Sequence, residues 1–150
     1  MRILLILLFV SFNGFSQTYD DIMSINSLDM FNKVCIENQF ENFEVNYGTT
    51  TYAYKLTIDE ENFYNSKASI WSYYYHDNAF SFDFFLKNDE ANRKYNSIVD
   101  DIKRNCKFHK IIDEGDYKYA TYSCYQSLYK GKIGFMIKEG FGYVKHFVRE

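Results

Sequence analysis

Two stretches with the period of an amphipathic helix, each followed by short strand-like runs, constrain the fold of this chain most. Residues 89–105 carry apolar side chains at spacings of four, three and four, namely Ala91, Tyr95, Ile98 and Ile102. Residues 27–38 carry a similar apolar side made of Leu28, Phe31, Val34 and Cys35. These spacings predict two surface helices. Asn88 or Asp89 is a suitable N-cap for the longer one, and Asn26 with Asp29 resembles a capping box for the shorter one.

Each predicted helix precedes four runs that are typical of strands. The first four span residues 43–47, 51–58, 68–75 and 80–86, and the second four span residues 107–112, 117–124, 132–138 and 141–148. This order predicts an α+β fold, a mostly antiparallel sheet with two helices on one face. It also predicts a tandem duplication of a helix-plus-four-strands unit, over about residues 26–87 and 88–150. In element order alone, the chain resembles exported tandem-repeat proteins such as the β-lactamase inhibitor proteins, which implies an architecture and no function.

The last two runs, "GKIGFMIKEGFGYVKHF" at residues 131–147, predict a hairpin with two different sides. A two-residue turn at Glu139-Gly140 pairs Phe135 with Val144 and Met136 with Tyr143. The side of Ile133, Phe135 and Val144 is aliphatic enough to lie beneath the helices. The other side joins aromatic, thioether and cationic groups: Met136, Tyr143, Phe147, Lys132 and Lys145. We expect this second side to be exposed and to bind a partner, because aromatic patches rimmed by charge are typical of recognition surfaces.

The hairpin of residues 68–86 extends this surface if it turns at Asp77-Asn78. That register pairs Trp71 with Phe84 and Tyr73 with Phe82, a dense aromatic cluster that we expect in the core. Tyr74 then lies on the opposite side and joins the predicted binding surface. The alternative is that the second side of both hairpins meets a loop, such as residues 59–67, or the other half of a strongly curled sheet.

Two of the three cysteines are placed to form a disulfide. If the hairpin of residues 107–124 turns about Gly115, then Cys106 faces Cys124, and such a pair closes in an oxidising compartment. A slip of one residue would separate the two sulfurs. We expect Cys35, on the apolar side of its helix, to be a buried free thiol.

No pattern in the chain predicts a catalytic, metal or cofactor site. Cys106 and His109 could act as nucleophile and base, but no third orienting group is apparent and the disulfide would consume the cysteine. His76 and His146 lack metal-ligand spacing to another histidine or cysteine. We therefore predict no cofactor, no metal and no catalytic residue that the sequence can identify.

The amino terminus has the pattern of a signal peptide. Arg2 precedes an apolar run at residues 3–10, and the small residues Gly14 and Ser16 follow. Eight apolar residues are too few to span a bilayer, which takes about 20. We expect cleavage after Ser16, a single domain over residues 17–150 without a transmembrane segment, and a periplasmic or secreted location.

Charge and composition exclude one class of partner. Without Arg2, 16 of the 17 basic residues remain against 20 acidic ones, a net charge of −4 that argues against nucleic acid.

The sequence as a whole predicts a small exported, non-enzymatic domain that binds a protein, peptide or glycan through an exposed aromatic sheet face. Two alternatives stay open: a small secreted hydrolase with a scattered acid/base site, and a structural envelope protein. A deep cleft with two or more titratable groups would favour the hydrolase.

Overall fold

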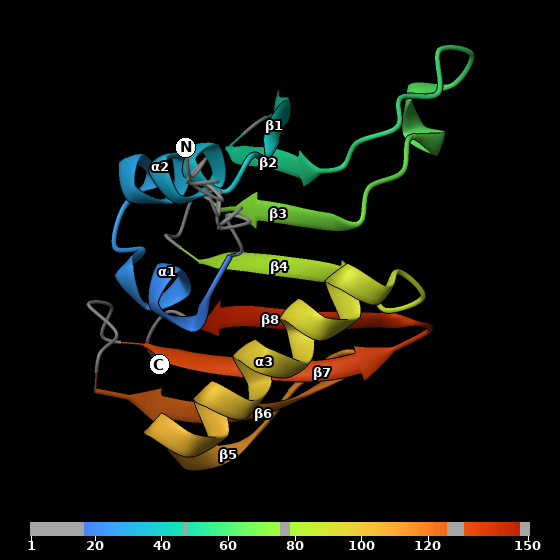
Figure 1. Cartoon of the computed structure of the whole chain (residues 1–150). Helices are drawn as coiled ribbons and strands as arrows, with labels where there is room; N and C mark the ends of the chain where they lie inside the picture. Colours follow the sequence, from blue (N-terminus) through green and yellow to red (C-terminus); the bar gives the residue numbers. More distant parts are fainter. Residues whose placement is uncertain (1–16, 47, 76–78, 126–130, 148–150) are drawn as a thin grey trace, which may run out of the picture.

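A computed structural model describes residues 17–46, 48–75, 79–125 and 131–147 as an α+β fold (Figure 1). One eight-stranded sheet, antiparallel at every described pairing, has the order β1-β2-β3-β4-β8-β7-β6-β5. Two four-stranded meanders thus meet where β4 pairs with β8. The expected signal peptide, residues 1–16, lies outside the described residues. No helix in the described ranges is long and apolar enough to cross a membrane.

The elements follow the predicted order with two additions, α1 and η1. The helices are α1 (Tyr19–Ser24), α2 (Leu28–Glu37) and α3 (Asp89–Asn105), with a short 3-10 turn η1 (Phe63–Asn65) between β2 and β3. The first meander consists of β1 (Glu41–Asn46), β2 (Thr49–Tyr54), β3 (Ile70–Tyr74) and β4 (Phe80–Phe85). The second consists of β5 (Cys106–Glu114), β6 (Tyr117–Cys124), β7 (Lys132–Lys138) and β8 (Phe141–Phe147).

Local capping explains where the helices begin. Ser27, rather than Asn26, is the N-cap of α2, and its hydroxyl accepts from the Met30 backbone N–H at 3.2 Å. Asn88 caps α3 as expected. Helix α1 was not predicted, because its six residues are too few to show a helical period. This helix begins with a capping box in which Thr18 and Asp21 satisfy each other's backbone N–H groups.

The helices pack on one face of the sheet, where an aromatic core forms. In Figure 1, α3 runs diagonally across the strands, and α2 lies near the β1–β3 edge. The ring of Phe31 on α2 lies 5.3 to 6.5 Å, centroid to centroid, from four sheet rings, those of Tyr52, Tyr74, Phe80 and Phe82. Burial of such side chains stabilises the fold by about 1.5 to 3 kcal/mol each. The core therefore depends on aromatic contacts made by α2 and α3.

The register predicted for the last hairpin is confirmed. Phe135 pairs with Val144 and Met136 with Tyr143. Both turn residues, Glu139 and Gly140, have positive φ values of 52° and 83°, as a two-residue hairpin turn that follows the sheet twist requires. Gly142 is needed for close packing, because a Cβ there would lie 2.7 Å from the Tyr95 ring of α3.

The register predicted for the β3–β4 hairpin is wrong by one residue. Tyr74, and not Tyr75, pairs with Phe80, and the Tyr75 backbone N–H donates to the Ala79 carbonyl at 2.8 Å. The predicted turn at Asp77-Asn78 itself lies outside the described residues. Because neighbouring side chains point to opposite faces, this shift exchanges the two sides of β3. Tyr74 is therefore a core residue, 5% exposed beneath Phe31, and Trp71 and Tyr73 lie on the face without helices.

The disulfide between Cys106 and Cys124 is present as predicted, although the strands around it are less regular than assumed. Near the turn, Glu114 pairs with Tyr117, one residue away from the expected register. A bulge between Phe108 and Lys110 adds a residue to β5 and restores the expected pairing at the two cysteines. Cys35 is a buried free thiol, also as expected.

Candidate functional site on the open face of the sheet

The face of the sheet opposite the helices, here called the open face, carries two continuous rows of side chains. One row, from β2 to β7, consists of Ala53, Trp71, Asp83, Tyr143 and Met136. The neighbouring row consists of Thr51, Tyr73, Ser81, Lys145 and Gly134. Residues from both meanders therefore lie side by side across the middle of this face.

The second meander curls over its half of the open face. Strands β8 and β5 are three strand spacings apart, about 14 Å in a flat sheet. Nevertheless, Lys145 Nζ on β8 donates to Glu114 Oε2 on β5 at 2.6 Å. Tyr117 packs edge-on against Tyr143 with ring centroids 5.6 Å apart, and Tyr119 is only 5% exposed on a face that carries no described helix. This half of the open face is concave and largely filled by its own side chains.

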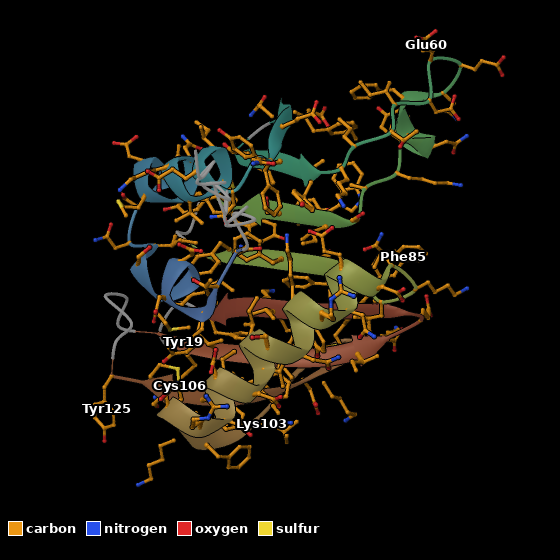
Figure 2. All side chains as sticks on the ribbon, viewed as in Figure 1. Tyr19, Glu60, Phe85, Lys103, Cys106 and Tyr125 are labelled. Atoms are coloured by element: carbon orange, nitrogen blue, oxygen red, sulfur yellow. A yellow bond between two sulfur atoms is a disulfide. The ribbon has the colours of Figure 1, made fainter. Side chains whose placement is uncertain are left out.

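The loop between β2 and β3 contacts the edge of the other half of the open face. The segment between β2 and β3 projects beyond the sheet, with Glu60 near its tip (Figure 2). At its base, the Phe63 ring stacks on Phe43 of β1 with centroids 4.4 Å apart and planes 9° apart. Phe43 in turn meets Trp71 at 4.9 Å and 80°. The loop thus builds a wall of aromatic rings along the edge of the sheet.

Between this wall and the sheet lies a pocket of about 320 Å³, here called the aromatic pocket. Five aromatic side chains line it: Phe43, Phe63, Tyr64, Trp71 and Tyr73. The polar lining comes from Glu44, Thr51 and Ser66. Tyr64 is 93% exposed at the rim, whereas Trp71 and Tyr73 form the half-buried floor.

Five of the six predicted binding residues lie on the open face, but none of the five is strongly exposed. Met136, Tyr143, Phe147, Lys132 and Lys145 are all half-buried. The sixth, Tyr74, is in the core, for the register reason given above. On the helix side, Ile133 and Val144 are buried as expected, but Phe135 is half-buried like Tyr143. The expected contrast in exposure between Tyr143 and Phe135 is therefore absent, because the curled second meander covers Tyr143.

Asp83 is the acid on the open face whose pKa is most strongly perturbed, and it was not among the predicted site residues. It pairs with Trp71 on one side and Tyr143 on the other, and its Oδ1 is buried without a hydrogen-bond donor among the described residues. Burial raises the pKa of Asp83 to about 7, although the Ser81 hydroxyl and the Lys145 charge act in the opposite direction. A single acid in the apolar run "FSFDFF" was the signal for this environment.

The tyrosines around Asp83 respond to the same environment. Burial, and then the nearby Asp83 charge, raises the pKa of Tyr143 to about 12. The same two causes raise the pKa values of Tyr73 and Tyr119. These phenols stay neutral and keep their hydrogens near neutral pH, so that they can donate hydrogen bonds.

Other polar clusters have structural roles. Glu90 of α3 is contacted by Tyr54, Lys55 and Lys94, with Tyr54 Oη donating at 2.7 Å. Burial opposes its ionisation, but these hydrogen bonds outweigh burial and lower the pKa of Glu90 to about 2. The cluster fixes α3 to the end of β2.

Two possibilities weighed from the sequence, a metal site and a Cys106–His109 pair, can be checked among the described residues. Within the described ranges, no three histidine, cysteine or acidic residues come together as possible metal ligands. Cys106 is consumed by its disulfide, so that it cannot serve as the nucleophile considered with His109. A second pocket of about 380 Å³ near α1 is lined by Thr18, Tyr19, Asp20, Asp101 and Asn105, but Asp101 is already paired with Arg104 at 2.9 Å.

Comparison with protein-family models, with curated proteins and with solved structures found no match to this chain. The geometry of the open face therefore provides the basis for a functional proposal.

Proposed function

We propose that this protein is a non-enzymatic binding domain that holds a protein, peptide or glycan on the open face of its sheet, with the aromatic pocket as the anchor. The observation that carries this proposal is the lining of the pocket by five aromatic side chains from β1, β3 and the loop before β3. Large, rigid aromatic groups in concave sites supply much of the binding energy in recognition surfaces.

The pocket fits binding better than hydrolysis. A glycosidase or a related hydrolase needs two titratable groups that face the same reacting bond. Glu44 is the single carboxylate that lines the aromatic pocket, and Asp83 lies outside its lining. The tyrosines and the indole of Trp71 supply contact area and hydrogen-bond donors, which suit recognition.

Tyr64 allows the proposal to be tested without disturbing the fold. Tyr64 is 93% exposed and Tyr125 is 90% exposed. Tyr125 lies just beyond the end of β6, away from the loop between β2 and β3 (Figure 2). Peptide and glycan arrays probed with the wild-type domain should yield a ligand whose affinity falls by about tenfold or more with Tyr64→Ala. Tyr125→Ala is the matched control and should leave the affinity unchanged. A ligand that responds equally to both variants, or to neither, would contradict an anchor in this pocket.

We further infer that the domain works outside the cytoplasm and that its two meanders arose by tandem duplication. The Cys106–Cys124 disulfide supports the first inference, since such bonds persist in oxidising compartments. Helix α2 precedes β1 to β4 and α3 precedes β5 to β8, and this repeated order supports the inference of a duplication.

A further inference from the structure

The first described residue, Gln17, is buried with an unpaired polar side chain. It is only 2% exposed, and neither Nε2 nor Oε1 of its amide has a hydrogen-bond partner among the described residues. Such groups are rare in folded proteins, because a buried donor without an acceptor loses its bonds to water and gains nothing in return. The unpaired amide of Gln17 therefore needs an explanation.

The position of Gln17 in the chain provides a second observation. It directly follows Ser16, after which we expect cleavage of the signal peptide, so that Gln17 becomes the first residue of the exported chain. Cleavage creates an α-amino group on residue 17, and this group is largely protonated at neutral pH. A buried residue would then carry a positive charge beside an unpaired amide.

The acids that follow Gln17 in the chain provide no described partner for that charge. Asp21 Oδ2 already accepts from the Thr18 backbone N–H at 2.8 Å and from the Thr18 hydroxyl at 3.0 Å. The same oxygen accepts from Asn38 Nδ2 at 3.5 Å. Asp20 is exposed to solvent. Because an unpaired buried ammonium is far costlier than a neutral group, the fold favours a form of residue 17 without charge.

An amino-terminal glutamine has an internal route to a neutral form. The α-amino nitrogen, in its unprotonated state, attacks the side-chain carbon Cδ, so that a bond from this nitrogen to Cδ forms and the bond from Cδ to Nε2 breaks. Nε2 takes one hydrogen from the α-amino group and leaves as ammonia. The product is a five-membered lactam, pyroglutamate, and the reaction needs no oxidant, reductant or cofactor. Ring closure removes the terminal charge and the unpaired Nε2 together.

We propose that Gln17 is a modification site, and that the mature chain begins with a buried pyroglutamate formed from it. This inference rests on the proposed export of the domain and on cleavage after Ser16. The ring must close while the new chain end is free, before residue 17 is buried. The carbonyl of residue 17 stays in its peptide bond to Thr18, so the capping box of Thr18 and Asp21 at the start of α1 is kept.

The mass of freshly harvested exported protein tests the inference. We expect a chain that starts at residue 17, is lighter by one ammonia than the chain with an open glutamine, and is blocked to stepwise degradation from its amino terminus. Gln17→Asn is the matched control, because it keeps an amide but would need a strained four-membered ring to close. The exported Gln17→Asn chain should have its full mass and an amino terminus that can be sequenced.

A second measurement tests the burial of the ring. Pyroglutamyl peptidase, which removes an amino-terminal pyroglutamate, should release it from a synthetic peptide of residues 17–25 that starts with the ring. Release from the folded domain should be slower by about tenfold or more, because the residue must first leave its buried position.

Three results would contradict the inference, and each can be recognised separately. Exported chain that starts at residue 17 with an open glutamine and a free amino group would remove the modification and leave export intact. Equal release of the ring from the peptide and from the folded domain would remove its burial. A chain that retains residues 1–16 would refute the cleavage itself, whereas the array experiment with Tyr64→Ala tests the binding function independently.

Discussion

Replacing the Asp83 carboxyl by a neutral amide should make the domain more stable at alkaline pH. In the folded state, burial holds the pKa of Asp83 at about 7, compared with its ordinary value of 3.8. At 1.36 kcal/mol per unit of pKa, this difference corresponds to about 4 kcal/mol. Asp83→Asn keeps the size of the side chain and removes the charge, so that this penalty disappears.

The pH window follows from the direction of the shift. Below about pH 4, Asp83 is protonated in both states and has no effect on the pH dependence. Between about pH 4 and 7, the unfolded chain releases the proton while the folded chain keeps it, so the free energy of unfolding falls as the pH rises. Well above pH 7, Asp83 is ionised in both states and no longer changes the free energy of unfolding with pH. Glu90 affects stability at lower pH. Its pKa is lowered to about 2 in the folded state, so its ionised form stabilises the fold, and this stabilisation is lost as the pH falls toward 2.

Urea denaturation between pH 4 and 8.5, followed by circular dichroism, measures this effect. We expect the stability difference between Asp83→Asn and the wild type to move in favour of the variant by about 4 kcal/mol over this range. A difference that does not change with pH would refute the assignment of a buried, largely protonated Asp83.

Four further predictions follow from other parts of the fold. Replacing Cys106 and Cys124 by serine should cost about 3 kcal/mol, because the bond closes a loop with a sequence separation of 18; equal denaturation midpoints with and without the bond would contradict this. Gly142→Ala should cost about 1 to 3 kcal/mol by pushing against the Tyr95 ring, whereas Lys138→Ala on the same hairpin should cost little in a thermal melt. Phe82→Ala should cost about 3 to 5 kcal/mol, and Phe135→Ala less because its side chain is half-buried; the reverse order in urea unfolding would refute the core assignment. Intact-mass measurement of exported protein should find a chain that begins at Gln17, and recovery of only full-length cytoplasmic chain would argue against export.

The hairpins show how far sequence reasoning about register reaches. The two-residue connection Glu139-Gly140, with glycine at its second position, is short enough to set every pair of β7 and β8 correctly. In the β3–β4 hairpin, Tyr74 instead of Tyr75 pairs with Phe80, a shift of one residue that no local pattern indicated. This shift places Tyr74 on the helix side and Trp71 and Tyr73 on the open face. In the β5–β6 hairpin, the pairing predicted from a turn about Gly115 is off by one residue near the turn. The bulge next to His109 shifts the pairing by one residue, so the prediction holds at Cys106 and Cys124.

The candidate site was predicted as a face but not as a pocket. The alternation along β7 and β8 placed Tyr143 and Lys145 on the open face. Their partial burial depends on Glu114 and Tyr117, which reach them only because the sheet curls, and curvature is a property of the whole sheet. The aromatic pocket needs Phe63 from a loop to meet Phe43 at a bulge in β1, a contact that no periodicity in the sequence encodes.

Both edges of the sheet are irregular, and this bears on how the domain behaves at high concentration. β1 has a register shift between Asn42 and Glu44, and β5 has one between Phe108 and Lys110. A regular edge offers a row of free backbone groups on which a strand from another molecule can pair, the first step of fibre growth. A bulge twists that row and interrupts its spacing, so neither β1 nor β5 is a good template for a ninth strand. A sheet this rich in tyrosine and phenylalanine thereby resists growing into an aggregate at its two ends.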